Sequence, residues 1–342
     1  MFGRFVLWLY AYGFAWVLVL VASMVQRRRM SHNCGVLASG KFRVVDAPQF
    51  PPHDFFTPGR EMRCRLRHAP VSYDDDTVIQ VRSASLKLAD ADVESPLDLE
   101  MNTGTISLFW SARSFFEFVG RKDDKPLPYG KYYDKYPVGL AAAKEGIRRS
   151  PSSFAEMHYY SQTVQYFVGI DGVQRYVKFR LLPATDAPET GIIPPEELVN
   201  RWSEERPPGE TKNRSYLKAE YAERVARGPV KYRLQLQLHT PSPDDTNEIF
   251  SCSAVWDEAT HPWMDVATVE MDTMLSLKDE SRAIFSLRHC PPSLALIPAR
   301  SLDDYNSINY LRAVADIAKR ARVFRYRFFN SGPADVRDDG KA

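Results

Sequence analysis

Alternation of polar and apolar residues over several long segments is the feature that most restricts how this chain can fold. Residues 229–240, PVKYRLQLQLHT, place Tyr232, Leu234, Leu236 and Leu238 between polar neighbours. Successive side chains of a β-strand point to opposite faces, so this segment is predicted to be a strand with one buried face. Similar patterns predict strands at 62–72, 77–89, 97–101 and 265–272.

Two more strand-like runs, 154–169 and 174–184, are joined by a turn that contains Asp171 and Gly172. An Asp-Gly pair between such runs is a strong hairpin signal, so these two strands are expected to pair antiparallel. Apolar residues at helical spacing and capping residues predict helices at 107–119, 138–148, 213–228 and 303–323. Many antiparallel strands, with helices gathered toward the C-terminal end, predict an α+β domain built on a barrel.

The N-terminal segment from Phe5 to Val25 is 21 residues long and contains no charged side chain. A helix rises about 1.5 Å per residue, so this segment is long enough to cross a hydrocarbon core of about 30 Å. We therefore expect a single membrane span, with a cleaved secretory signal as the alternative. Three arginines at 27–29 outweigh Arg4, and the positive-inside rule then places the remaining chain on the cytosolic side.

Composition indicates a globular protein without a strong overall charge. The 342 residues include 45 basic and 43 acidic side chains, a balance that excludes the general electrostatic field of a nucleic-acid-binding protein. The four cysteines form no C-x-x-C pair, which argues against a zinc ribbon or a dense disulfide framework. The predicted organisation is a membrane anchor at 1–30, an irregular N-terminal arm at 31–60, a barrel domain at 61–328 and a flexible tail at 329–342.

His68 stands near the end of a basic run, RCRLRHAP, at residues 63–70. If this segment is extended, its three arginines lie on one face, whereas His68 shares the other face with Cys64 and Leu66. The simplest interpretation is a core imidazole that is hydrogen-bonded to a backbone carbonyl. A catalytic role for His68 needs support from elsewhere in the chain.

Several motifs resemble those of the catalase superfamily, over most of residues 60–325. The pattern Arg65-x-x-His68-Ala69 is similar to the family's R-x-x-H-A strand, and DLEMNTG, which contains Asn102, is similar to D-L-x-x-N-N-T-P. Counting on from Asn102, Phe115 stands where the family has a phenylalanine against the haem plane. Further segments that resemble the family are 83–88, 255–272 and 284–299.

The resemblance implies a catalase-like antiparallel β-barrel with flanking helices that binds haem and acts on peroxides. It places His68 over the distal face of the haem, Arg65 near a propionate and Phe115 against the ring. An imidazole whose pKa is near 6.5 can take a proton from a bound hydroperoxide and return it, whereas the amide of Asn102 can only hold oxygens by hydrogen bonds. The alternatives are a turn role for Asn102 before Gly104 and a core role for Phe115.

The sequence departs from the family at the axial position of the haem iron. The family ligates iron with a tyrosine in an R-x-x-x-Y motif, and here Arg312 is followed four residues later by Asp316. Asp316 is therefore the candidate metal ligand and Arg312 a candidate haem contact, since a carboxylate is a hard oxygen donor. The alternatives are ligation by Tyr310 or Tyr305 and weak or absent haem binding.

Two functions follow from these observations. The first is a membrane-tethered, haem-dependent peroxidase that converts organic or lipid hydroperoxides rather than hydrogen peroxide, since the anchor would hold the pocket where oxidised acyl chains arise. The second is a non-catalytic, haem-free barrel that binds an apolar ligand or a partner protein.

A homo-oligomer is expected only by analogy with the family. A third idea is a metal centre, for which the candidate ligands are His158, His239, His261 and His289.

Overall fold

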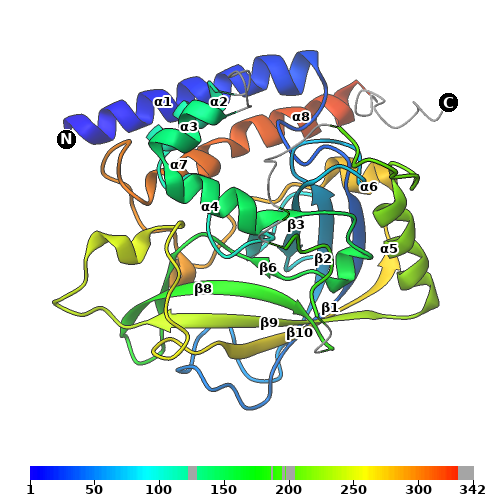
Figure 1. Ribbon diagram of the computed structural model, residues 1–342. Helices are drawn as coiled ribbons and strands as arrows, with labels where there is room; N and C mark the ends of the chain where they lie inside the picture. Colours follow the sequence, from blue (N-terminus) through cyan, green and yellow to red (C-terminus); the bar gives the residue numbers. More distant parts are fainter. Residues whose placement is uncertain (122–128, 186–187, 195–196, 198–204, 330–342) are drawn as a thin grey trace.

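Eight antiparallel strands close into a barrel in the computed structural model, which describes residues 1–121, 129–185, 188–194, 197 and 205–329 (Figure 1). The order around the barrel is β2-β1-β10-β9-β8-β6-β4-β3, and pairing of β2 with β3 closes the ring. The short strands β5 and β7 add to β3 and β8. A closed barrel leaves no free strand edge among these eight, which explains why so many long strands are tolerated.

The strands have the following bounds: β1 Val36–Val44, β2 Glu61–Pro70, β3 Gln80–Lys87, β4 Asp98–Asn102, β5 Ile147–Arg148, β6 Tyr159–Tyr160, β7 Gln165–Val168, β8 Gln174–Pro183, β9 Val230–His239 and β10 Met264–Met274. The α-helices are α1 Phe2–Leu18, α2 Ala112–Val119, α3 Gly130–Lys135, α4 Pro137–Gly146, α5 Tyr216–Arg227, α6 Leu277–Arg282, α7 Ser307–Val314 and α8 Asp316–Phe328. A π-helical segment, η1 Val19–Val25, continues α1, and short 3₁₀ turns are η2 Phe154–Glu156, η4 Asn247–Phe250 and η5 Pro292–Leu294.

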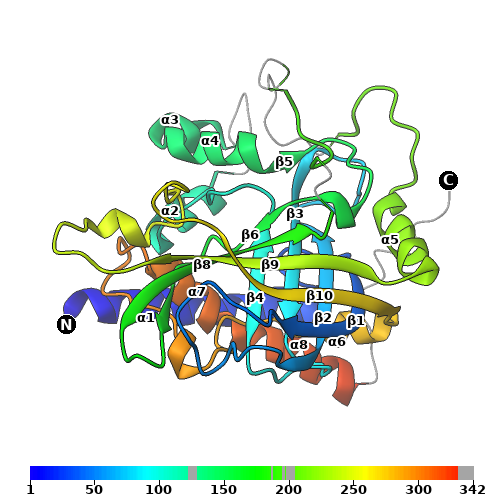
Figure 2. The same ribbon diagram turned by 90° about the horizontal axis from the view of Figure 1, so that it is seen from below.

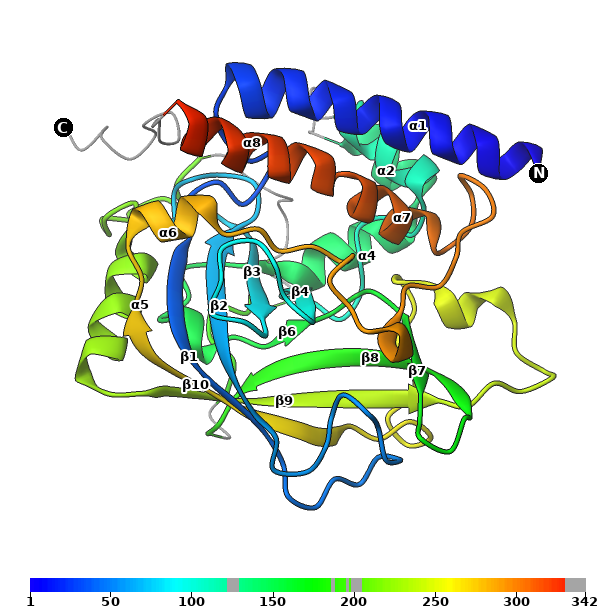
Figure 3. The same cartoon turned by 180° about the vertical axis from the view of Figure 1, so that it is seen from behind.

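The helices form a layer on one side of the barrel. Helix α1 runs alongside α7 and α8, which lie between it and the strands (Figures 1 and 3). Helix α2 also contacts α7, whereas α3 and α4 lie near β5 at another edge of the barrel (Figure 2). This arrangement leaves space between the helical layer and the outer face of β2, β3 and β4.

Most predicted elements are confirmed. The predicted strands at 62–72, 77–89, 97–101 and 265–272 correspond to β2, β3, β4 and β10, and the alternating segment 229–240 is β9. The Asp-Gly turn joins β7 to β8 with Gly172 at φ 72°, a conformation that glycine adopts without strain. The run 154–169 is broken into η2, β6 and β7 rather than forming one strand.

Two predictions of organisation are wrong in detail. The interval 31–60, predicted to be an irregular arm, contains β1, so the barrel begins before residue 61. The predicted helix 303–323 is divided at Ala315 into α7 and α8. The predicted tail 329–342 lies almost entirely outside the described residues.

Glycine at position 40 explains why β1 was difficult to recognise as a strand. The pairing of β1 with β10 has an irregularity between Ser39 and Gly40. A Cβ atom at Gly40 would lie 1.8 Å from the carbonyl oxygen of Glu270, so only glycine permits this close approach. Glycine normally weakens a strand signal, and here it marks a bulge.

Candidate active site

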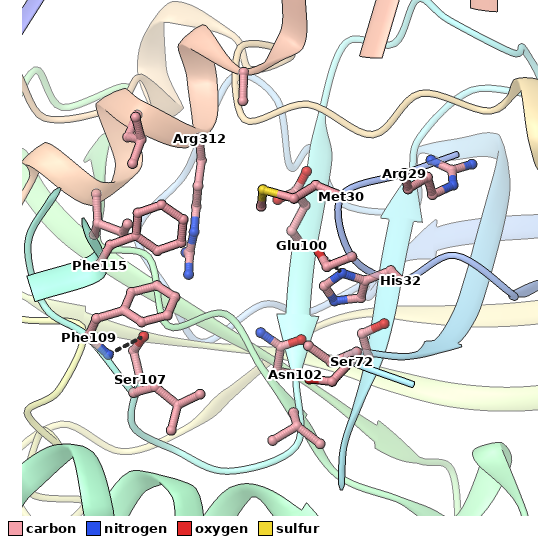
Figure 4. A pocket seen from close by; sticks show the side chains of 18 of the residues that line it. Arg29, Met30, His32, Ser72, Glu100, Asn102, Ser107, Phe109, Phe115 and Arg312 are labelled. Carbon is pink, nitrogen blue, oxygen red and sulfur yellow. Dashed lines mark hydrogen bonds between the residues drawn. The ribbon is translucent and has the colours of Figure 1, made fainter. Parts of the chain in front are cut away.

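A cavity of about 510 Å³ lies between the outer face of the barrel and the helical layer. Its barrel wall comes from β2, β3 and β4, and its helical wall comes from α1, η1, α2, α7 and α8. Aromatic and aliphatic side chains cover much of the surface, and polar and charged side chains lie between them (Figure 4). This volume is in the range of pockets that hold organic ligands of moderate size.

His32 is the imidazole that faces this cavity. It lies in the connection between η1 and β1, with φ at 59°, in the left-handed region that a histidine occupies only when its surroundings hold it there. Its backbone N–H donates to the carbonyl of Val71 at 3.0 Å, and its own carbonyl accepts from Arg67 Nη2 at 2.6 Å. These two bonds fix the backbone and so aim the ring at the cavity.

The imidazole of His32 is held in its neutral form. Burial lowers the pKa of His32 to about 3, and the nearby Arg67 guanidinium acts in the same direction, although the Glu100 carboxylate and the Asn102 side chain oppose them. The Ser31 hydroxyl lies 2.7 Å from Nδ1. When the Ser31 oxygen accepts the Nδ1 proton, Nε2 is left as a hydrogen-bond acceptor on the cavity side.

Asn102 and Phe115 reach the same cavity from separate elements. Asn102 is the last residue of β4 and pairs in the ladder with Ser83 on one side and Tyr160 on the other. Phe115 is on α2, which begins with a capping box between Ser111 and Ser114. Both side chains line the cavity together with His32, as Figure 4 shows.

His68 lies inside the barrel, on the opposite side of β2 from the cavity. Its side chain is fully buried, its Nε2 is 3.1 Å from the hydroxyl of Tyr232, and its ring stacks on Phe154 at a centroid distance of 5.2 Å. Because strand side chains alternate, Arg67 faces the cavity and His68 faces the core. The structure therefore does not bring His68 together with Asn102 and Phe115, and its surroundings are those of a core imidazole.

The predicted haem contact Arg65 is also outside the cavity lining. Arg65 Nε donates to Asp90 at 2.7 Å, and its Nη1 donates to Asp92 at 3.0 Å. Neighbouring Arg67 and the more distant Arg29 and Arg322 line the cavity instead. The sequence also contained a signal for the cavity histidine, because Arg29 and His32 have the same R-x-x-H spacing as Arg65 and His68.

Asp316 does not face the cavity. It is the first residue of α8, is 1% exposed, and accepts a hydrogen bond from Arg320 Nε at 2.6 Å through its Oδ2. Tyr305 and Tyr310, the alternative ligands, are also absent from the cavity lining, whereas Arg312 is part of it. Of the four predicted metal-centre histidines, His239 and His261 contact each other, but the described residues contain no group of three metal-ligating side chains.

Known structures share this fold. A crystal structure of a fungal catalase superposes with a TM-score of 0.62 at 19% identity, covering 95% of this chain and 68% of that one. Catalase A from Saccharomyces cerevisiae gives a TM-score of 0.62 at 18% identity, covering 97% and 72%. At these identities the likeness concerns the fold.

The chain also has relatives in sequence. The chain is 41% identical over 289 residues to the allene oxide synthase-lipoxygenase protein of Plexaura homomalla, covering 83% of this chain. It is also 31% identical over 228 residues to the uncharacterised protein y4iK of Sinorhizobium fredii, covering 65% of this chain and 95% of that protein. The chain has a catalase-like fold and is a relative of the Plexaura protein.

This chain matches only part of its longer relatives. It spans 27% of the Plexaura protein and 37% of the linolenate 9R-lipoxygenase of Nostoc, to which it is 30% identical over 300 residues, or 84% of this chain. No family model matches the chain.

One wall of the cavity in this catalase-like fold carries side chains suited to a haem, and the opposite, helical wall does not. His32 and Asn102 are suited to the face where a peroxide would bind, and the side chains of Arg29, Arg67 and Arg322 are suited to carboxylates of the porphyrin.

The helical wall offers the iron no axial ligand of the expected kind. Helices α7 and α8 contribute seven described residues to the lining, Ile308, Leu311, Arg312, Ala315, Ala318, Lys319 and Arg322. The only one with a nitrogen suited to iron is Lys319, and its ammonium is hydrogen-bonded to Glu100 at 2.6 Å. The described residues of this wall therefore do not fit an axially ligated haem, because none carries an imidazole, phenol, thiol, thioether or carboxylate.

Proposed function

We propose that this protein acts on organic hydroperoxides, which it binds in the cavity beside His32 and Asn102. The observation that supports this most directly is the presence of a neutral imidazole and a carboxamide in one largely apolar cavity. Its relatives include an allene oxide synthase-lipoxygenase protein and a linolenate lipoxygenase. The second name refers to a fatty acid, which supports a lipid hydroperoxide over hydrogen peroxide.

The two polar groups have complementary tasks in this proposal. Nε2 of His32 accepts a hydrogen bond from the hydroperoxide O–H group, the position from which it can act as a general base, while the amide N–H of Asn102 donates to one of the peroxide oxygens. The apolar side chains around them, among them Phe109, Phe115 and Leu311, receive the hydrocarbon part of the molecule and exclude water.

Replacing His32 by Gln tests this proposal. General acid–base groups typically contribute about 10²- to 10⁴-fold to a rate, so His32→Gln should lower the conversion of a C18 hydroperoxide by that factor. His158→Gln, outside the cavity lining, is the matched control and should retain the wild-type rate. Wild-type conversion by His32→Gln would contradict the proposal.

A second candidate function is supported by the helical wall. None of the described lining residues on α7 and α8 has a side chain that usually ligates haem iron. A haem-free protein that binds an apolar ligand without turnover therefore fits the same cavity.

Absorption spectroscopy of the purified full chain separates the two functions. A stoichiometric Soret band with hydroperoxide conversion supports the enzyme, and ligand binding without either supports the haem-free binding protein. An Asp316→Tyr variant should not gain haem, because Asp316 is outside the cavity lining and its carboxylate is hydrogen-bonded to Arg320.

We further propose that the protein associates with a membrane through α1 and η1. Within the described residues, Phe2–Val25 forms one helix that is long and apolar enough to cross a membrane, properties that a buried core helix or a signal sequence can share. One stripe of this helix is buried against the protein and contains Leu7, Ala11 and Ala15. The opposite side exposes apolar side chains, including Phe2, Phe5, Trp8, Leu9, Trp16, Val17, Leu20 and Val21.

This packing favours a helix that lies in the plane of a membrane surface, because the buried stripe cannot contact the protein and also be surrounded by lipid. Vesicle flotation of the full chain measures the association. Trp8→Lys and Trp16→Lys should each reduce the bound fraction, whereas Ile170→Lys, at an exposed apolar residue of the β7–β8 turn, should not. Equal binding by all three variants would argue against this face.

A further inference from the structure

We propose that Arg312 binds a carboxylate, so that the cavity selects long-chain free carboxylic acids over their neutral esters. This inference rests on the proposed function only in taking the ligand to be a lipid. It assigns to Arg312 a task that differs from the haem contact expected from the sequence.

Arg312 has no hydrogen-bonded anionic partner among the described residues. It projects from α7 into the cavity, with its guanidinium carbon 5.9 Å from the ring centroid of Phe109 (Figure 4). Among the described residues it makes no hydrogen bond and no salt bridge. Two carboxylates that could pair with it bind other cations: Asp316 on α8 pairs with Arg320 at 2.6 Å, and Glu100 on β4, across the cavity, pairs with Lys319 at 2.6 Å.

An unpaired guanidinium among aromatic and aliphatic side chains is costly. A charged group that is partly removed from water needs a partner of opposite charge, and arginine presents a planar fork that matches the two oxygens of a carboxylate. The side chains around Arg312 include Phe109, Phe115, Ile308 and Leu311, none of which can accept a hydrogen bond. The missing partner is therefore expected to come with the ligand.

The charge of the whole lining points the same way. Among the described residues, Glu100 is the one carboxylate that lines the cavity. Burial raises its pKa, but the Lys319 ammonium and the Arg312 guanidinium lower it by more, so that the carboxylate stays ionised. Cations outnumber it: the lining contains Arg28, Arg29, Arg67, Arg312, Lys319 and Arg322. Such a cavity attracts an anion.

The position of Arg312 also separates two ends of a ligand. Arg312 enters the cavity beside Phe109 and Phe115, whereas His32 and Asn102 enter from the other side (Figure 4). A molecule with a carboxylate at one point and a hydroperoxide farther along an apolar chain satisfies both sites at once. A fatty-acid hydroperoxide has this form.

Binding of cis-parinaric acid and its methyl ester to the full chain tests the inference by fluorescence. We expect the wild type to bind the acid about 10- to 100-fold more tightly than the ester, since a hydrogen bond to a charged group is worth about 1.5–3 kcal/mol. Arg312→Gln should weaken binding of the acid by that factor and leave the ester unchanged. Arg312→Lys should retain part of the preference, and Arg300→Gln, at an exposed position outside the lining, should retain all of it.

The outcomes separate this inference from the proposed function. Equal affinities of the wild type for acid and ester would overturn the role of Arg312, whether or not the variants fold. Equal weakening of acid and ester by Arg312→Gln would overturn it too, since that result indicates damage to the cavity. Because the probe carries no hydroperoxide, a carboxylate preference without hydroperoxide conversion would refute the enzyme and keep the carboxylate site.

Discussion

At the scale of single residues, the site depends on a network behind His32. Arg67 holds the His32 carbonyl, and Arg67 in turn is bound by Glu280, with 2.8 Å between its Nε and Oε1. Both side chains are almost fully buried, at 3% and 2% exposure. Arg29 donates to the backbone carbonyl of Glu280 at 2.8 Å, so one segment supports two arginines of the cavity wall. The left-handed conformation of His32 is stable because this network fixes it.

Removal of the Glu280 charge should be strongly destabilising. Glu280→Gln leaves Arg67 buried without its carboxylate, and breaking a buried pair typically costs about 3–5 kcal/mol. The free energy of unfolding in urea measures the effect. Asp303→Asn removes the partner of Arg113 in an exposed pair and should cost less than about 1 kcal/mol. Similar losses in the two variants would contradict the structural role of Glu280.

The buried histidines should make stability depend on pH. Burial lowers the pKa of both His32 and His68 from 6.5 to about 3. The unfolded chain then binds more protons than the folded chain between these values, so the free energy of unfolding should fall as pH is lowered from 6.5 toward 3. The slope is at most about 1.4 kcal/mol per pH unit for each histidine.

Denaturation at pH 7 and at pH 5 measures this slope. His68→Gln keeps a group that can hydrogen-bond to Tyr232 and should remove about half of the histidine contribution. His239→Gln, at a partly exposed position, is the control. An unchanged slope in His68→Gln would show that the His68 imidazole is not kept neutral by the fold.

At the scale of secondary structure, β2 decides which histidine can act. Its alternation sends Cys64, Leu66 and His68 into the barrel and Arg67 toward the cavity. The connection between η1 and β1 brings His32 next to the end of β4, where Asn102 lies. A site on a connection anchored to a rigid strand is a common solution in enzymes, because the strand positions the residue and the connection lets it reach the ligand.

The buried stripe of α1 should tolerate little added volume. Ala15 is fully buried in a cluster that includes Leu7 and Leu311, so Ala15→Leu should lower the free energy of unfolding by about 1–3 kcal/mol. Gly13→Ala is a matched change two residues earlier, where a Cβ atom would meet nothing within 4 Å. It should stabilise the helix by about 0.5–1 kcal/mol. Thermal and urea unfolding of the full chain distinguish these outcomes, and no loss in Ala15→Leu would mean that α1 does not pack as described.

At the scale of the whole molecule, α1 and η1 have two roles. Phe14, Leu18, Ala22 and Ser23 line the cavity, and Ser23 Oγ donates to the carbonyl of Ala318 at 2.8 Å. The opposite side of the same helix is the exposed apolar face that we propose to contact lipid. In that arrangement one helix separates the cavity from the membrane surface, so a lipid ligand would have a short path between them.

Adjacent substitutions on α1 test its role as a cavity wall. Leu18→Trp adds volume inside the cavity and should weaken binding of cis-parinaric acid by about tenfold or more, because an occupied cavity cannot repack freely. Val17→Trp adds the same ring at a residue that is 55% exposed and should leave the affinity unchanged. Fluorescence titration compares the two, and equal affinities would indicate that the ligand binds elsewhere.

The sequence by itself determined the barrel class, most strands and three of the cavity residues, Asn102, Phe115 and Arg312. Polar and apolar alternation is a local property, so β2, β3, β4, β9 and β10 were predictable. Asn102 and Phe115 were found because they lie in short motifs whose spacing is preserved.

Only the tertiary structure decided which imidazole shares their cavity. His32 and His68 both follow an arginine at the same spacing, but His68 faces the interior of the barrel and His32 faces the cavity. Likewise, the sequence motif placed Asp316 at the position of an iron ligand. In the structure Asp316 is hydrogen-bonded to Arg320 outside the cavity lining. Arg312 does line the cavity, without a hydrogen-bonded partner among the described residues. Both outcomes depend on contacts between segments far apart in the chain, and local pattern carries no information about such contacts.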